Sequence, residues 1–212
     1  MVTLLVVLLA VVVLVGVGYV TASRRRRIAA GAIVDIAQLL EPKVESEGVV
    51  AAADDATPPL TDSLTSLGNR QLLERDLAVY EGQVARYGLR VCVALIDVDG
   101  FSDFNAHYGR ERGNEILVAI AEQLAKRSRS GDSVYRFGGD EFICLLPEQT
   151  LLTGTKAVDR MKRSVQDLAI PFEGSPGGIV SVSAGLTILD AEHLKASGEL
   201  LREAEAALLA SR

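Results

Sequence analysis

The 212-residue chain contains no tryptophan, only two cysteines and few aromatic residues, 5% in all. Cys92 and Cys144 lie in apolar runs far apart in the sequence, which is typical of a reduced cytosolic domain and excludes a disulfide framework and a cysteine zinc site. Basic residues are also scarce: apart from Arg24 to Arg27, the chain has 18 basic against 28 acidic side chains, a net charge of −10. So acidic a body, without a Lys/Arg cluster, excludes a protein that coats DNA or RNA polymers.

Val2 to Val20 is an uncharged, apolar run of 19 residues, about the length that a helix needs to cross a bilayer. We therefore predict one transmembrane helix in residues 1–22. The arginines follow this run, whereas a signal peptide carries its positive charge in front, so we expect the C-terminal body to stay in the cytoplasm, anchored to the inner membrane by a single pass. The alternative is a cleaved or wrongly assigned N-terminus. Residues 23–60 are predicted to form a basic juxtamembrane segment, a helix and a linker.

Residues 61–212 have room for one ordinary domain, and helical and strand-like patterns alternate along them. This order predicts an α/β fold with one sheet flanked by helices. The Gly138–Gly139 pair is suited to a tight turn, so the strands around it are predicted to form a hairpin joined through these glycines. The expected helices are 70–86, one with the apolar stripe 116–124, 155–168 and 198–210; the expected strands are 90–97, 133–137, 141–146 and 179–188.

Acidic residues gather at two predicted strand ends. Asp97 and Asp99 end the apolar strand, and Asp140 and Glu141 follow the two glycines. Carboxylates at the end of a buried strand are costly unless a cation or hydrogen-bond donors receive them, and ligands bind at strand ends in α/β sheets. The residues alone leave two interpretations open: a Mg²⁺ and phosphate site, or an ordinary strand end and an ordinary turn.

Residues 138–142 read GGDEF, and the sequence around them resembles the GGDEF family, the diguanylate cyclases that make cyclic di-GMP from two GTP. The resemblance extends from about Asp62 to the end of the chain. It includes LTSLGNR (64–70), IDVDGF (96–101), Asn105, Tyr108, Gly109, Gly113, Arg136 and SVSAG (181–185). The resemblance implies an α+β, nucleotidyl-cyclase-like domain with a central, mostly antiparallel sheet.

It also implies a catalytic metal site. In the family, two carboxylates and one backbone carbonyl hold Mg²⁺, for which Mn²⁺ can substitute; here they correspond to Asp97, Asp140 and the carbonyl of Val98. Asp140 would also help to deprotonate the 3′-hydroxyl of GTP, and Glu141 would share the metal. The amides of Gly138 and Gly139 would contact phosphate oxygens.

The positions that read guanine in the family are Asn105 and Asn114, and the second of these is normally aspartate. A carboxylate accepts hydrogen bonds from both N1–H and the exocyclic amine of guanine, whereas an amide presents one acceptor and one donor. We therefore expect weaker guanine binding or a relaxed choice of purine. Arg110 stands near the base position and is either a nucleotide contact or a solvated charge.

The resemblance is weaker at the C-terminus. Glu205 and Leu209 replace the family's aspartate and tyrosine, Arg212 replaces a phosphate-binding lysine, and the given chain stops before a later arginine. We therefore expect a degenerate phosphate clamp, with Arg212 as its remaining cation.

Arg129 and Asp132 form an RxxD pattern six residues before Gly138, the position of the family's inhibitory site. The pair is either a cyclic di-GMP site that limits synthesis or a solvated ion pair. The resemblance further implies that catalysis needs a homodimer, because each protomer holds one GTP. The leading hypothesis is a membrane-anchored, Mg²⁺-dependent, product-inhibited diguanylate cyclase. The alternative is an inactive GGDEF module that binds cyclic di-GMP or GTP and signals through a protein partner.

Overall fold

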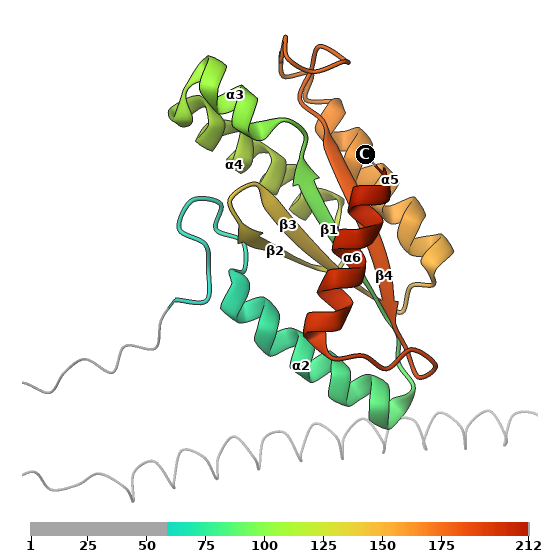
Figure 1. The fold of residues 1–212 in the computed structure, drawn as a ribbon. Coiled ribbons are helices and arrows are strands. Elements are labelled where there is room, and N and C mark those ends of the chain that lie inside the picture. Colours follow the sequence, from blue (N-terminus) through green and yellow to red (C-terminus); the bar gives the residue numbers. More distant parts are fainter. Residues whose placement is uncertain (1–58, 212) are drawn as a thin grey trace, which may run out of the picture. The chain divides into compact units, whose positions relative to one another are not determined.

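The computed structural model describes residues 59–211, which form a four-stranded sheet with helices on both faces (Figure 1). The strands follow the order β2-β3-β1-β4, and all three pairings are antiparallel. The elements in chain order are α2 (Arg70–Tyr87), β1 (Val91–Val98), α3 (Phe101–Tyr108), α4 (Arg110–Arg127), β2 (Ser133–Gly138), β3 (Glu141–Pro147), α5 (Leu151–Gln166), β4 (Val182–Leu189) and α6 (Ser197–Ser211). The predicted α+β fold with an antiparallel sheet flanked by helices is confirmed.

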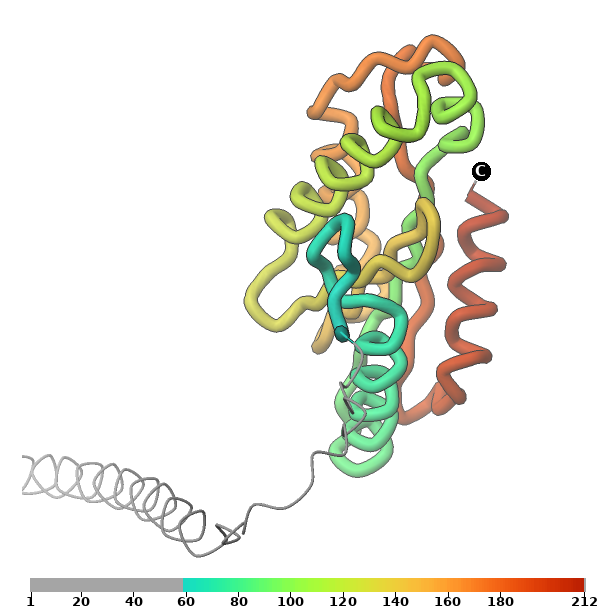
Figure 2. The backbone as a smooth tube through the Cα atoms, turned by 90° about the vertical axis from the view of Figure 1, so that its left-hand side faces the viewer, coloured from blue at the N-terminus to red at the C-terminus, as the bar shows by residue number. Residues whose placement is uncertain are grey.

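The strands bury both of their faces because successive side chains point to opposite sides of the sheet. On β1, Cys92, Ala94 and Ile96 enter one core with α3, α4 and α5, and Val91, Val93 and Leu95 enter another with α2 and α6. Figure 2 shows α4 and α6 on opposite sides of the sheet. This double burial explains why β1 reads as a continuous apolar run.

Local sequence signals position the helices on these cores. The side chain of Asn69 caps α2 by accepting a hydrogen bond from the backbone N–H of Leu72 at 3.1 Å. Helix α6 packs closely against β4 because Gly185 has no side chain: a Cβ there would lie 2.0 Å from the carbonyl oxygen of Ala204. The SVSAG segment therefore keeps α6 close to the sheet.

The β2–β3 hairpin forms as predicted, but its turn is one residue further along the chain. Gly138 pairs with Glu141, so the connecting residues are Gly139 and Asp140 and not the two glycines. The cause is a β-bulge, which shifts the register between Arg136 and Gly138. Gly139 has a φ of +49°, a value that favours glycine, and Asp140 lies in the turn itself.

Other element boundaries differ from the sequence prediction. The helix with the apolar stripe is preceded by a separate short helix, α3, and Gly109 at φ +87° lies between the two. Helix α5 begins four residues before the predicted start, at Leu151, because Thr150 and Thr153 cap it reciprocally. Strand β4 begins at Val182, three residues later than expected.

The predicted transmembrane helix (1–22) and the juxtamembrane segment up to residue 58 lie outside the described residues. From Pro59 to Ser211, no helix combines the length and the apolar character needed to span a membrane.

Candidate active site

The acidic residues of β1 and of the hairpin lie at the same end of the sheet. Asp97 pairs directly with Glu141 in the β1–β3 ladder, and Asp140 immediately precedes Glu141 in the turn. Directly opposed residues of an antiparallel pair have their Cβ atoms about 4.5–5.5 Å apart, and like charges in such a pair repel. A divalent cation at this end would stabilise the arrangement.

A cavity of about 390 Å³ opens at this end. Asp97, Asp99 and Asp140 line it, together with Val98, Gly100, Phe101 and Ser102. Glu141 does not line it. Three of the four residues expected around the metal, Asp97, Val98 and Asp140, are therefore brought to one cavity, whereas Glu141 lies beside it in the sheet.

The N-terminus of α3 supplies the donors of the cavity. Gly100 precedes the helix with a φ of +65°, and no side chain caps it. The first backbone N–H groups of a helix have no intrahelical partner and favour anions. Carboxylates and unpaired amides thus line one cavity, an arrangement that suits a cation together with phosphate oxygens.

The donor set fits Mg²⁺, because this ion prefers carboxylate and carbonyl oxygens and retains several waters. Asp97, Asp140 and the carbonyl of Val98 could hold it, and phosphate oxygens and water would complete the shell. Within residues 59–211, no group of three or more His, Cys, Asp or Glu side chains is arranged to hold a metal ion.

Arg136 on β2 links the hairpin turn to Asp62, which precedes α2. Its Nη2 and Nε donate to the carbonyl oxygen of Gly139 at 2.7 and 3.0 Å, and its Nη1 donates to the carboxylate of Asp62 at 3.1 Å. Burial alone would raise the pKa of Asp62, but hydrogen bonds from Thr65 and the Arg136 guanidinium outweigh this effect and keep the pKa below its usual value. The ion pair is therefore present at neutral pH.

The predicted base-reading residues lie at the α3–α4 junction. The Oδ1 atom of Asn105 is buried and has no hydrogen-bond partner among the described residues. A Cβ on Gly113 would lie 1.9 Å from this oxygen, so the carboxamide lies directly over the glycine that precedes Asn114. An unsatisfied buried acceptor costs about 1–3 kcal/mol.

The other predicted nucleotide contacts are Arg110 and Arg212. Arg110 is exposed at the start of α4, and Arg212 lies outside the described residues. A second cavity, of about 460 Å³, shares Asp99 and Gly100 with the first and reaches Ser211 at the end of α6. The end of α6 therefore borders the same region as the acidic cavity.

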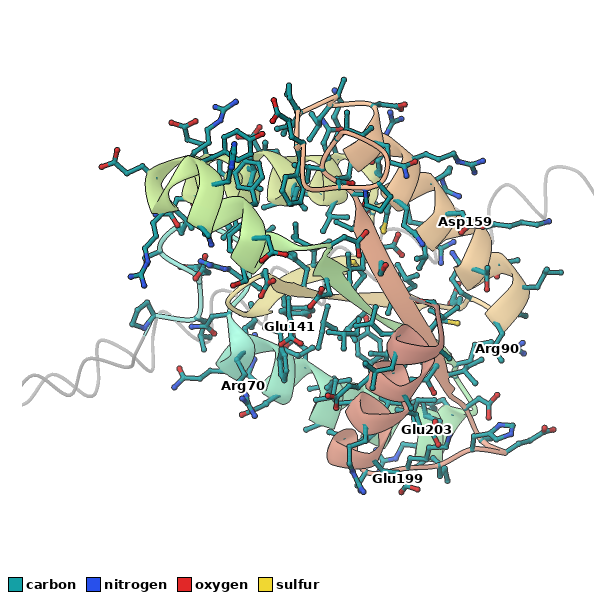
Figure 3. The ribbon with its side chains drawn as sticks, turned by 45° about the horizontal axis from the view of Figure 1, so that its top comes forward. Arg70, Arg90, Glu141, Asp159, Glu199 and Glu203 are labelled. Carbon is teal, nitrogen blue, oxygen red and sulfur yellow. The ribbon has the colours of Figure 1, made fainter. Side chains whose placement is uncertain are left out.

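The RxxD residues lie at the opposite end of the sheet. Arg129 pairs with Asp132 at 3.1 Å, and it also donates to the carbonyl oxygen of Pro147, the last residue of β3. A cavity of about 450 Å³ is lined by Arg129, Ser130, Gly131 and Arg90, among others. Figure 3 shows Arg90 and Glu141 at opposite ends of the central strands. Of the two residues of the predicted inhibitory site, Arg129 lines this cavity, which is well separated from the carboxylates, and Asp132 does not.

Comparison with known proteins identifies the domain. A family described as "Diguanylate cyclase, GGDEF domain" matches residues 60–212. The chain belongs to the GGDEF family. The diguanylate cyclase DgcP of Pseudomonas aeruginosa is 35% identical over 137 residues, which are 65% of this chain and 20% of DgcP. TpbB, a diguanylate cyclase of the same species, is 34% identical over 148 residues, 69% of this chain and 34% of TpbB.

The fold comparison agrees. The crystal structure of the diguanylate cyclase SiaD from Pseudomonas aeruginosa, solved in complex with its activator SiaC, is 27% identical, with a TM-score of 0.67 over 90% of this chain and 66% of SiaD. The chain spans only about a fifth to a third of the two curated relatives, so the GGDEF domain is the part that they share.

Sequence reasoning missed two contributors to the site. The N-terminus of α3 was not expected because that helix was not predicted. Its only signal is the glycine after the DxD pair. The contact between Asp62 and Arg136 joins residues 74 positions apart, and no local pattern in the sequence indicates it.

Proposed function

We propose that this GGDEF protein is a Mg²⁺-dependent diguanylate cyclase that condenses two GTP into cyclic di-GMP and two pyrophosphates. The observation that carries the proposal is the cavity in which Asp97, the backbone of Val98 and Asp140 meet the N-terminus of α3. The curated names of DgcP and TpbB support the same activity.

The residues have separable roles in this reaction. Asp97, Asp140 and the Val98 carbonyl hold the metal, and the first amides of α3 bind phosphate oxygens. When bound, Mg²⁺ offsets the charge of the triphosphate and orients the α-phosphate. The Asp140 carboxylate accepts the proton of the 3′-hydroxyl. The 3′-oxygen then bonds to the α-phosphorus of the other GTP, and the bond from that phosphorus to pyrophosphate breaks.

Guanine is read by Asn105 and Asn114 in this proposal. The carboxamide of Asn105 lies against Gly113, the residue that precedes Asn114, so both side chains would contact one base. Asn114 is exposed and offers one acceptor and one donor where a carboxylate would offer two acceptors. We therefore propose weak guanine binding as a property of this protein.

Two GTP-loaded protomers must face each other, since each 3′-hydroxyl attacks the other's phosphate. We propose that a homodimer is the active form, and that an N-terminal membrane anchor raises the local concentration of protomers. Product bound at Arg129 and Asp132 would limit synthesis through a coupling between the two ends of the domain.

The alternative function is a receptor without turnover. It is favoured by Asn114 and by the C-terminal helix, where Leu209 is 64% exposed in place of the family's tyrosine. The receptor would bind cyclic di-GMP beside Arg129 or GTP at the acidic cavity and pass the signal to a partner.

One assay separates the two functions. The purified full chain is incubated with GTP and Mg²⁺, and cyclic di-GMP and pyrophosphate are quantified by chromatography, with Asp140→Ala as the control. Product from the wild type but not from the variant supports the cyclase. Absence of product, together with tight cyclic di-GMP binding that Arg129→Ala abolishes, supports the receptor.

A further inference from the structure

We propose that Arg136 is a positioning residue for the catalytic turn, because it ties the peptide between Gly139 and Asp140 to the N-terminal segment of the domain through Asp62. The inference deepens the proposed function, since Asp140 is one of the expected metal ligands. Figures 1 and 2 both show the segment before α2 beside the β2–β3 hairpin.

The turn needs an external restraint. Gly138 and Gly139 are exposed and follow a β-bulge, and glycine has more backbone freedom than any other residue. A turn with this composition does not by itself hold Asp140 in one orientation. A metal ligand that moves freely binds its ion weakly, because the ligand must be ordered when the ion binds.

Arg136 restrains the turn at the right atom. Two of its nitrogens donate to the carbonyl oxygen of Gly139, at 2.7 and 3.0 Å. A peptide unit is planar, so fixing the C=O of Gly139 also fixes the direction of the N–H and the Cα of Asp140. The guanidinium therefore orients the residue that carries the metal-binding carboxylate without touching that carboxylate.

Asp62, at the other end of the restraint, is itself held by hydrogen bonds. Asp62 Oδ1 accepts from the N–H and the hydroxyl of Thr65 at 2.9 and 2.8 Å, and the N–H of Asp62 donates to Leu67. The N–H of Arg136 donates to the carbonyl of Gly68 at 2.8 Å. Asp62 is thus part of a hydrogen-bonded turn. This turn is joined to β2 by a backbone hydrogen bond as well as by the ion pair.

The ion pair between Arg136 and Asp62 is largely shielded from solvent, so it can contribute to holding the turn. The side chains of Arg136 and Asp62 are 16% and 21% exposed, whereas an exposed pair contributes little. The guanidinium donates to the carbonyl and to the carboxylate from three separate nitrogens, and the compact ammonium of lysine cannot reproduce this geometry. We therefore expect that position 136 needs arginine, because its side chain serves two acceptors, Gly139 and Asp62, on separate segments of the chain.

The test compares Arg136→Gln, Arg136→Lys and Asp62→Asn in the full chain, with Arg160→Gln as the control. Arg160 is exposed on α5 and, among residues 59–211, donates to its own helix, at the carbonyl of Lys156. Two measurements are made: hydrogen exchange of the 137–142 backbone in the protein without metal or nucleotide, and the Mg²⁺ dependence of cyclic di-GMP formation.

We expect Arg136→Gln to speed exchange in 137–142 at least several-fold while exchange in β1 and α5 stays at the wild-type rate. We expect it to raise the Mg²⁺ concentration for half-maximal rate about 10- to 100-fold, the range typical of groups that orient metal ligands. Arg136→Lys should not restore either value. Asp62→Asn should give a smaller change that is not additive with Arg136→Gln.

Unchanged exchange in 137–142 overturns the proposal, and so does a faster exchange spread evenly over the whole domain, since that result describes a general loss of stability. Wild-type catalysis with an unaltered Mg²⁺ requirement in Arg136→Gln also overturns it. If the wild type makes no cyclic di-GMP but exchange responds as expected, the proposed function fails and the positioning role stands.

Discussion

The two ends of the β1–β3 strand pair differ in the charge that they present. At one end Asp97, Asp140 and Glu141 bring negative charge to the end of the sheet, which favours a cation. At the other end Arg129, 52% exposed, is held against Asp132, 2% exposed, and the carbonyl of Pro147. Its guanidinium can meet a phosphate or a guanine edge directly. One pair of strands thus carries, at its two ends, two proposed nucleotide sites that differ in charge.

The carboxylate end is expected to be the more sensitive of the two. Asp97→Ala should lower cyclic di-GMP formation at least about 100-fold, because it removes a metal ligand and its loss exceeds that of an orienting group. The rate is measured with saturating GTP over a range of Mg²⁺. Asp159→Ala is the matched control, since Asp159 is exposed on α5, away from Glu141 (Figure 3). A rate for Asp97→Ala within threefold of that of Asp159→Ala would refute the metal site.

At the other end, Arg129→Ala should weaken cyclic di-GMP binding about 10- to 100-fold, because hydrogen bonds from a charged donor contribute about 1.5–3 kcal/mol. Calorimetric titration of the full chain with cyclic di-GMP measures the affinity. Arg127→Ala removes an exposed arginine from the last turn of α4 and should leave the affinity unaltered. Equal affinities for the two variants would mean that the Arg129–Asp132 pair is only structural.

The strand framework of both ends could be predicted from the sequence, because β1 is an apolar run buried on both faces and the hairpin is marked by glycines. The turn register could not. A bulge inside β2 moves the turn onto Asp140, and no residue type announces a bulge. Helix α3 has eight residues and buries only Phe104, too little for a helical period to appear. The Arg136–Asp62 pair depends on tertiary folding alone.

A change at the predicted base-reading residue Asn114 has a smaller expected effect than Asp97→Ala or Arg129→Ala. Asn114→Asp should tighten GTP binding about tenfold, since a second charge-assisted acceptor toward guanine is worth about 1–3 kcal/mol. Affinity for a non-hydrolysable GTP analogue and for its adenine counterpart is measured on both proteins. We expect only the guanine analogue to gain. An equal gain for both bases, or none, would contradict the role assigned to Asn114.

The smallest expected effect concerns the ion pair between Arg136 and Asp62. The pKa of Asp62 lies below its ordinary value of 3.8 in the folded protein, so its charged form favours folding. This contribution is present above the unfolded pKa and is lost as the pH falls through the folded pKa. Asp62→Asn should therefore lower the free energy of unfolding by about 1 kcal/mol at pH 7, and by progressively less below about pH 4.

Urea denaturation of the wild type and of Asp62→Asn at pH 7, 5 and 3.5 gives the two stability curves. Their convergence at low pH would show that the pair acts through the charge on Asp62. A constant difference at all three pH values would instead show that the charge on Asp62 does not cause the effect, because asparagine still offers an oxygen to the N–H and the hydroxyl of Thr65. Arg136 would then contribute orientation without stability.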